Sequence, residues 1–174
     1  MGARSSGMKI IGLAGWSGSG KTTLMVQLLE EITARGVKVS TMKHAHHAVD
    51  IDQPGKDSWR HRRAGASEVM LVTGSRWFLM HEKRDDPEPP IDSLIERMEP
   101  VDLLIVEGFK RYPIDKLEVY RPSVGKPPIW PEDERIIAVA SDAAEVAGLD
   151  RPLLDLNDPP AIVDFILSHT GLRP

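Results

Sequence analysis

Four residues near the start of the chain have the types and spacing of a phosphate-binding loop. Gly15, Gly20, Lys21 and Thr22 follow the pattern G-x-x-x-x-G-K-[ST]. Glycine has no Cβ atom, so a glycine-rich loop can fold tightly and turn its backbone N–H groups toward phosphate oxygens. Lys21 can then reach the β- and γ-phosphates, and the Thr22 hydroxyl can ligate Mg²⁺. The pattern predicts a loop that binds a nucleoside triphosphate.

The segments on either side of this loop are those that such a loop requires. Residues 8–14 form an apolar run with the length and branching of a buried strand, and residues 21–35 carry apolar side chains at helical spacing, with Gly36 as the stop signal. The first turn of that helix adds unpaired N–H donors and the positive end of the helix dipole. The candidate nucleotide-binding residues in this stretch are Gly15, Ser17, Gly18, Ser19, Gly20, Lys21, Thr22 and Thr23.

A second strand, expected at residues 102–109, predicts where the metal ion is held. It is apolar between Asp102 at its start and Glu107 near its end. At about 3.3 Å per residue the two carboxylates lie about 16 Å apart, and parallel sheets bind their ligands at the carboxyl ends of the strands. We therefore predict that Glu107 and Thr22 bind Mg²⁺ and that Asp102 is structural. The candidate catalytic residues are Lys21 and Glu107.

The connection after the strand expected at residues 37–42 is rich in cations. Nine of the twenty-one residues from Lys43 to Arg63 are Lys, Arg or His, and a polar connection this long inside a compact domain usually has a function. It leaves the ligand end of a strand that neighbours the phosphate loop, which favours anion binding over a merely solvated surface. The histidines suit phosphate binding or proton transfer better than structural zinc, because the chain has no cysteine. The candidate anion-binding residues are His44, His46, His47, Lys56, Arg60 and Arg63.

The rest of the chain predicts an α/β fold with an inserted β-hairpin. A short helix at 59–64, capped by Asp57 or Ser58, precedes two strand-like runs at 68–73 and 76–81 that are joined by the turn signal Gly74-Ser75. Further strands are expected at 116–121, where polar and apolar residues alternate, at 135–140 and at 152–156. Further helices are expected at 91–98 and at 159–169, the latter capped by Asp158.

These elements define the expected fold class and domain organisation. The class is that of the P-loop NTPases: α/β, with a mostly parallel sheet flanked by helices and an inserted β-hairpin arm at about residues 68–90. We expect a single domain over residues 8–172, which follows a disordered leader at residues 1–7.

Composition excludes several classes of function. The net charge of −4 argues against a nucleic-acid binder that relies on bulk electrostatics. No apolar run is long enough to cross a membrane, and the absence of cysteine fits a reducing compartment, so we expect a cytoplasmic protein. The expected arm is unusually apolar around Trp77 and Phe78, which predicts that it either packs on the core or covers an exposed edge of a second subunit, and a dimer is our hypothesis.

The combination of motifs resembles the MobB family of molybdopterin-guanine dinucleotide biosynthesis proteins. The residues that carry this resemblance are the loop at 15–23, the K-H-A-H-H segment at 43–47, the run at 50–60, V-E-G-F at 106–109 and A-S-D at 140–142. The resemblance implies a GTP-binding, weakly GTP-hydrolysing adapter that uses Mg²⁺. It also implies partners: molybdopterin or its guanine dinucleotide, and the guanylyltransferase that attaches GMP to molybdopterin. A homodimer with a partly exchanged β arm, in the prokaryotic cytoplasm, is implied as well.

Recognition of the guanine base has no standard motif in this chain, since the Asn-Lys-x-Asp signature of many GTPases is absent. Asp142 is the candidate for bonding the base edge, because it follows a later strand at the ligand end of the sheet. The alternative is that Asp142 caps a helix over residues 143–146.

Two other functions remain open from the sequence. One is a P-loop small-molecule kinase, in which the basic loop clamps phosphate. The other is a nucleotide-gated binding module without useful turnover.

Overall fold

The computed structural model describes residues 7–45, 52–109 and 112–172 of the chain. The chain forms two compact units, one from residues 1–44 with 99–174 and one from residues 45–98. The expectations of a leader at residues 1–7 and of one domain over 8–172 remain predictions, and residues 1–6 lie outside the described residues. None of the helices in the described ranges has the length and apolar character needed to cross a membrane.

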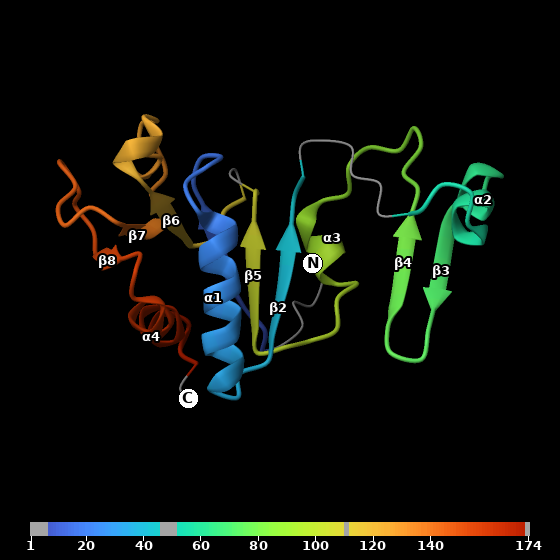
Figure 1. Ribbon diagram of the computed structural model, residues 1–174, viewed down its shortest axis with the longest axis horizontal. Helices are drawn as coiled ribbons and strands as arrows, with labels where there is room; N and C mark the ends of the chain where they lie inside the picture. The colour runs from blue at the N-terminus through green and yellow to red at the C-terminus, as the bar shows by residue number, and fades with distance from the viewer. Residues whose placement is uncertain (1–6, 46–51, 110–111, 173–174) are drawn as a thin grey trace. The chain divides into compact units, whose positions relative to one another are not determined.

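The first unit is built on a six-stranded sheet in which every neighbouring pair of strands is parallel. The strand order is β2-β5-β1-β6-β7-β8 (Figure 1). This arrangement confirms the predicted α/β class with a mostly parallel sheet. The strands are β1 Lys9–Ala14, β2 Val39–Lys43, β5 Leu103–Glu107, β6 Lys116–Tyr120, β7 Ile136–Ser141 and β8 Leu153–Asp155.

Two helices, α1 Lys21–Ala34 and α4 Pro159–Thr170, cover one face of this sheet (Figure 1). Alternate side chains of the buried strands point to this face and meet the apolar stripes of both helices, which forms the main core. As predicted, Asp158 caps α4, since its Oδ1 accepts a hydrogen bond from the Ala161 N–H at 3.1 Å. The fully buried members of this core include Ile11, Leu24, Leu28, Ile32, Leu103, Ile105, Leu117, Ile162 and Ile166.

The strand order corrects one expectation about β2. The sequence predicts a strand beside the phosphate loop, but β2 pairs with β5, and β5 separates it from β1. The burial of β5 explains this order: Leu103–Glu107 is buried at every position, as an inner strand with both faces covered must be. β2 has the sequence VSTMK and is half-buried or exposed throughout, which suits an outer strand.

The strand predicted at residues 116–121 forms as β6, but the charged residues that alternate along it are not at the surface. Lys116 and Glu118 are both buried, although they are charged. Lys116 Nζ lies 3.0 Å from Asp133 Oδ2, and the Glu118 carboxylate accepts hydrogen bonds from the backbone N–H groups of Ile129 and Trp130. A buried charge is tolerated when its hydrogen bonds are satisfied in this way. The two side chains therefore fasten the segment after β6 to the strand itself.

That segment covers part of the second face of the sheet. It contains two short 3₁₀ helices, η1 Pro122–Val124 and η2 Trp130–Glu132. The Trp130 ring is buried and meets the Tyr120 ring edge-on, with the ring centroids 5.4 Å apart. Trp130 forms a second small core with Ile136 and Val139. The connection between β6 and β7 is thus a packed structure with its own anchors.

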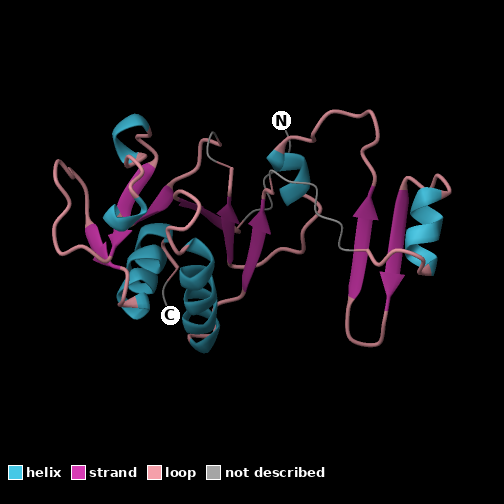
Figure 2. Ribbon diagram, turned by 45° about the horizontal axis from the view of Figure 1, so that its top comes forward, coloured by secondary structure: helices cyan, strands magenta, loops and turns pink. Residues whose placement is uncertain are grey.

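The second unit contains the predicted hairpin and two short helices (Figure 2). Its elements are α2 Asp57–Arg63, β3 Glu68–Val72, β4 Trp77–His81 and α3 Ile91–Ile95. The antiparallel register pairs Val72 with Trp77, and the Thr73 N–H donates to the Arg76 carbonyl at 2.9 Å. The two-residue turn at Gly74-Ser75 is therefore confirmed.

Two helix boundaries in this unit were predicted wrongly. α2 already begins at Asp57, with Lys56 at the N-cap position and no side-chain cap, because the Ser58 hydroxyl donates to Asp52 instead. α3 ends at Ile95 and not at residue 98. Beyond it the N–H groups of Arg97 and Met98 bond to carbonyls three residues back, which is the tighter 3₁₀ pattern.

Glu118 gives the fold a testable pH dependence. Burial raises the pKa of its carboxyl group, although the hydrogen bonds from Ile129 and Trp130 oppose the rise. A raised folded-state pKa means that the stability this group contributes is full below the unfolded pKa and is lost as the pH rises through the folded one. We expect the unfolding free energy of the wild type to fall relative to that of Glu118→Gln as the pH rises from about 4 to 8 in urea titrations. A difference that does not change with pH would contradict this account.

Candidate functional site

The loop between β1 and α1 is a tight cradle at the carboxyl edge of the sheet. Gly15 follows β1 with a backbone φ of 141°, in a region that side chains rarely tolerate. A Cβ atom on Gly15 would lie 2.6 Å from the carbonyl oxygen of Val119 in β6 and 2.8 Å from Ser19 Oγ. The loop therefore packs so closely on β6 that only glycine fits at this point.

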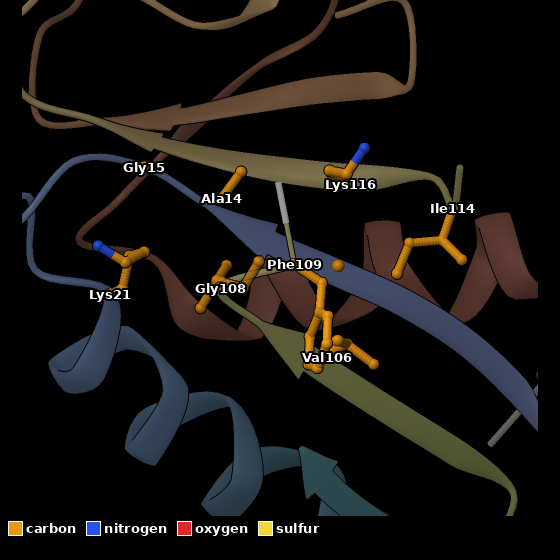
Figure 3. A pocket seen from close by; sticks show the side chains of 10 residues that line it. Ala14, Gly15, Lys21, Val106, Gly108, Phe109, Ile114 and Lys116 are labelled. Carbon is orange, nitrogen blue, oxygen red and sulfur yellow. The ribbon is translucent and has the colours of Figure 1, made fainter. Parts of the chain in front are cut away.

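Lys21 folds back over the loop from the first turn of α1. Its Nζ donates to the carbonyl oxygen of Trp16 at 2.8 Å, and the same oxygen accepts from the Ser19 N–H at 3.2 Å. Figure 3 shows the Lys21 side chain beside Gly15. The ammonium group is thus held at the cradle by the backbone of the loop itself. Thr22, the predicted metal ligand, is exposed in the same helical turn.

Ser19 is the unusual polar residue of the cradle. The residue is buried, and its Oγ is the one buried side-chain oxygen or nitrogen in the described ranges that has no hydrogen-bond partner. A buried hydroxyl without a partner costs about 1–3 kcal/mol. An anion bound in the cradle would accept a hydrogen bond from this hydroxyl and so remove that cost. The glycine-only packing and this orphan donor both fit a phosphate-bearing ligand.

Glu107 lies where the metal-site prediction requires it, at the carboxyl end of β5. In the register it is level with Leu13 of β1 on one side and with Lys43 of β2 on the other. Its side chain is 11% exposed, and its Oε1 lies 3.4 Å from Lys43 Nζ. Asp102 lies at the other end of the strand, where its Oδ2 accepts from the Lys38 N–H at 2.8 Å. This bond fits the structural role predicted for Asp102.

His44 is the first candidate anion-binding residue that the structure places at this edge. Its N–H donates to the Glu107 carbonyl at 2.9 Å, which extends the pairing of β2 with β5 by one residue. Its ring contacts the Phe109 ring, with centroids 4.9 Å apart. Gly108 allows this approach, because a Cβ atom there would lie 2.6 Å from the His44 carbonyl oxygen. His46 and His47 lie outside the described residues.

The other candidate anion-binding residues, Lys56, Arg60 and Arg63, belong to the second unit. The arginines around them have different environments. Arg62 forms ion pairs with Asp52 at 3.3 Å and Glu82 at 2.8 Å and is largely buried. The Arg63 guanidinium lies over the Trp59 ring, 5.6 Å from its centroid. The cation-rich stretch is therefore not one uniform patch, since the charge of Arg62 is engaged in ion pairs within the second unit.

Arg121 is a residue of the site that the sequence analysis missed. It directly follows β6, and its Nε donates to the Ser19 carbonyl at 3.1 Å, while its NH1 donates to Asp142 Oδ2 at 2.5 Å. A lone arginine after a strand carries no motif, and only the strand order shows that this strand lies beside β1. The alternative role of Asp142 as a helix cap is wrong, because residues 143–146 form no helix.

A small pocket adjoins the cradle on the face opposite α1 and α4 (Figure 3). Phe109 and Ile114 form its apolar wall, and the side chains of Lys21 and Lys116 border it. It continues the candidate phosphate site toward the end of β5. Its remaining lining comes from Gly12, Leu13, Ala14, Gly15, Val106 and Gly108.

Comparison with known sequences identifies related proteins. The sequence model of the family described as molybdopterin guanine dinucleotide synthesis protein B (MobB) matches residues 10–142. A Haemophilus influenzae protein named molybdopterin-guanine dinucleotide biosynthesis adapter protein is 44% identical over 161 residues, covering 90% of this chain and 86% of that protein. The Escherichia coli protein of the same name is 41% identical over 161 residues and 91% of either chain.

Comparison with solved structures gives the same picture of the fold. A crystal structure of molybdopterin-guanine biosynthesis protein B is 26% identical to this chain with a TM-score of 0.73, covering 92% of this chain and 99% of that one. The crystal structure of Bacillus subtilis MobB is 24% identical with a TM-score of 0.73, covering 93% and 98%. At that identity the second likeness supports the fold alone.

The crowding at Gly15 is testable against a matched glycine of the same loop. Gly18 also has a positive φ, of 84°, but a Cβ atom there would meet nothing within 4 Å. We expect Gly15→Ala to lower the unfolding free energy by about 2 kcal/mol more than Gly18→Ala, because only the former drives a methyl group into a backbone carbonyl. Urea denaturation of both variants measures the difference. Equal losses would mean that the loop can move away from β6.

Proposed function

The chain belongs to the family of molybdopterin guanine dinucleotide synthesis protein B, and on that premise we propose that it is a GTP-binding adapter. In this proposal it binds GTP with Mg²⁺, hydrolyses it slowly, and assists the guanylyltransferase that attaches GMP to molybdopterin. The observation that carries the proposal is the cradle after β1, where the crowded Gly15, the orphan hydroxyl of Ser19 and the Lys21 ammonium surround one small space. The names of the relatives supply the pathway.

The residues of the cradle have distinct roles in this proposal. The loop N–H groups and Lys21 would neutralise charge on the β- and γ-phosphates, and Lys21 would exchange the Trp16 carbonyl for a phosphate oxygen. Thr22 and Glu107 would hold Mg²⁺, directly or through water, and the ion would add positive charge between the two phosphates. Glu107 would then release Lys43, its partner in this structure.

The hydrogen bonds of Arg121 favour slow turnover of the nucleotide. Efficient GTPases add an arginine that stabilises transition-state charge and a residue that positions the attacking water. Arg121 contacts the loop, but through the Ser19 carbonyl and with Asp142 as its second partner. An arginine bound in this way is committed to positioning. This favours an adapter over an efficient catalyst.

The cationic residues outside the cradle would receive the second anion of the reaction. His44 lies beside Glu107, and Lys56, Arg60 and Arg63 lie on or next to α2. Molybdopterin and its guanine dinucleotide both carry phosphate, for which arginine and lysine are suitable partners. We include His46 and His47 with this group on the strength of the sequence alone. The proposal places the protein in the cytoplasm, with the guanylyltransferase as its partner.

The hairpin arm would join two copies of the chain. Val72 and Trp77 face each other across the hairpin and are 65% and 57% exposed, and the pairs next to them are exposed as well. An isolated two-stranded hairpin is marginally stable in water, and exposed apolar surface of this kind usually marks an interface. A second copy would cover the arm of the first, in a symmetric homodimer. The exposed apolar residues are Met70, Leu71, Val72, Trp77, Phe78 and Leu79.

Nucleotide titration tests the central proposal. In calorimetry with Mg²⁺ we expect the wild type to prefer GTP to ATP, and Lys21→Ala to bind GTP about 10- to 100-fold more weakly, because a charged hydrogen-bond donor to phosphate is lost. Lys38→Ala is the control, since it removes an exposed lysine that directly precedes β2, at the amino ends of the strands. Molybdopterin is then added to the GTP-bound protein. A preference for ATP without pterin binding would favour the alternative, a P-loop small-molecule kinase.

The dimer has its own test. We expect Trp77→Ser to raise the dissociation constant of the dimer about tenfold or more in analytical ultracentrifugation, because large aromatic residues dominate interface energies. Val26→Ser is the matched control, as Val26 is 51% exposed on α1, which belongs to the first unit. A wild-type chain that sediments as a monomer at micromolar concentration would contradict the proposed dimer.

A further inference from the structure

The segment that follows β6 forms hydrogen bonds with both ends of the phosphate loop. At the start of the loop the indole N–H of Trp16 donates to the Pro127 carbonyl at 2.7 Å. At its end the Ser19 carbonyl accepts from Arg121 Nε at 3.1 Å. The segment itself is anchored, because Glu118 binds the N–H groups of Ile129 and Trp130. The shape of the loop therefore depends on groups outside its own sequence.

The bond from Arg121 to Ser19 fixes the direction of the next N–H group. A peptide unit is planar and trans, so its C=O and N–H point in opposite directions. The Ser19 carbonyl and the Gly20 N–H belong to one such unit. Since the carbonyl points to the guanidinium, the Gly20 N–H points away from it. Arg121 thereby orients one of the donors that a phosphate-binding loop presents.

The same guanidinium also fixes Asp142 on the neighbouring strand end. Its NH1 donates to Asp142 Oδ2 at 2.5 Å, and the two side chains are about one-third exposed, at 33% and 31%. In the described part of the chain, Asp142 Oδ1 accepts no hydrogen bond. A guanidinium is planar and carries its donors in a rigid fork, so it can join two acceptors in a set geometry as a lysine cannot. One carboxylate oxygen is left available to a ligand.

We propose that Arg121 is a positioning residue that couples the phosphate cradle to the recognition of the nucleotide base. It holds the Gly20 N–H toward the phosphates and holds the Asp142 carboxylate toward the base edge, where the N1–H and 2-amino groups of guanine are the matching donors. This inference rests on the proposed binding of GTP. It assigns Arg121 no contact with the ligand itself.

The test compares three ligands, which separate the effect of Arg121 on phosphate binding from its effect on base recognition. GTP offers Asp142 two donors, inosine triphosphate lacks the 2-amino group, and inorganic triphosphate has no base. We expect Arg121→Gln to bind inorganic triphosphate several-fold more weakly and to lose most of the wild-type preference for GTP over inosine triphosphate. A preference of about tenfold to a hundredfold is the usual size for a hydrogen bond to a charged group. Asp142→Asn should lose the same preference but keep its affinity for inorganic triphosphate.

Three further variants distinguish positioning from general stability. The double variant Arg121→Gln with Asp142→Asn should show no further loss of base preference beyond Asp142→Asn, because the arginine acts through the aspartate. Arg121→Lys should resemble Arg121→Gln, since it keeps the charge but loses the fork. Arg135→Gln is the control. Arg135 directly precedes β7 at the amino ends of the strands, where it is exposed and pairs with Asp115. This variant should bind all three ligands as the wild type does.

The possible failures are distinguishable. A wild-type preference for GTP over inosine triphosphate that persists in Arg121→Gln would overturn the inference. So would a wild type that binds both nucleotides equally, because Asp142 would then not touch the base, while GTP binding itself would stand. A wild type that binds neither nucleotide would refute the proposed function.

Discussion

The close contact between Gly15 and β6 is the constraint on which the rest of the site depends. The loop can follow β1 in this shape because nothing larger than hydrogen separates it from the Val119 carbonyl. β6 must therefore lie immediately beside β1 and be fixed at this point. Two buried side chains of β6 secure that, Lys116 through its ion pair with Asp133 and Glu118 through its bonds to the segment after the strand. Two buried charges thus support the phosphate loop at a distance.

The local parts of this arrangement could be read from the sequence, because they depend on residues close to one another in the chain. The spacing of Gly15, Gly20 and Lys21 predicts the loop between β1 and α1, and the apolar strand that ends in Glu107 predicts a carboxylate at the carboxyl end of β5. Asp158 was identified as a helix cap in the same way. Each of these inferences uses a rule that needs only a few neighbouring residues.

The parts that failed depend on which strands lie side by side. β6 shows the alternation of a half-exposed strand, yet it is an inner strand, because Asp133 and the N–H groups of residues 129 and 130 satisfy its charges. β2 was placed one strand too close to the loop, since nothing in its own sequence shows that β5 would enter between them. Arg121 was missed for the same reason. A long-range partner decides each case, and local periodicity carries no information about it.

Three charged side chains of the candidate site are held by partners within the chain. Lys21 holds the Trp16 carbonyl, Lys43 holds Glu107, and Arg121 holds Asp142. Each pair keeps a functional group near the place where a nucleotide would need it, so little rotamer freedom remains to be lost on binding. Under the proposed function the first two pairs would open to admit phosphate and metal, whereas the third would persist, because Asp142 Oδ1 is still available. Binding at this site is therefore an exchange of partners around a fixed frame, and Arg121 belongs to the frame.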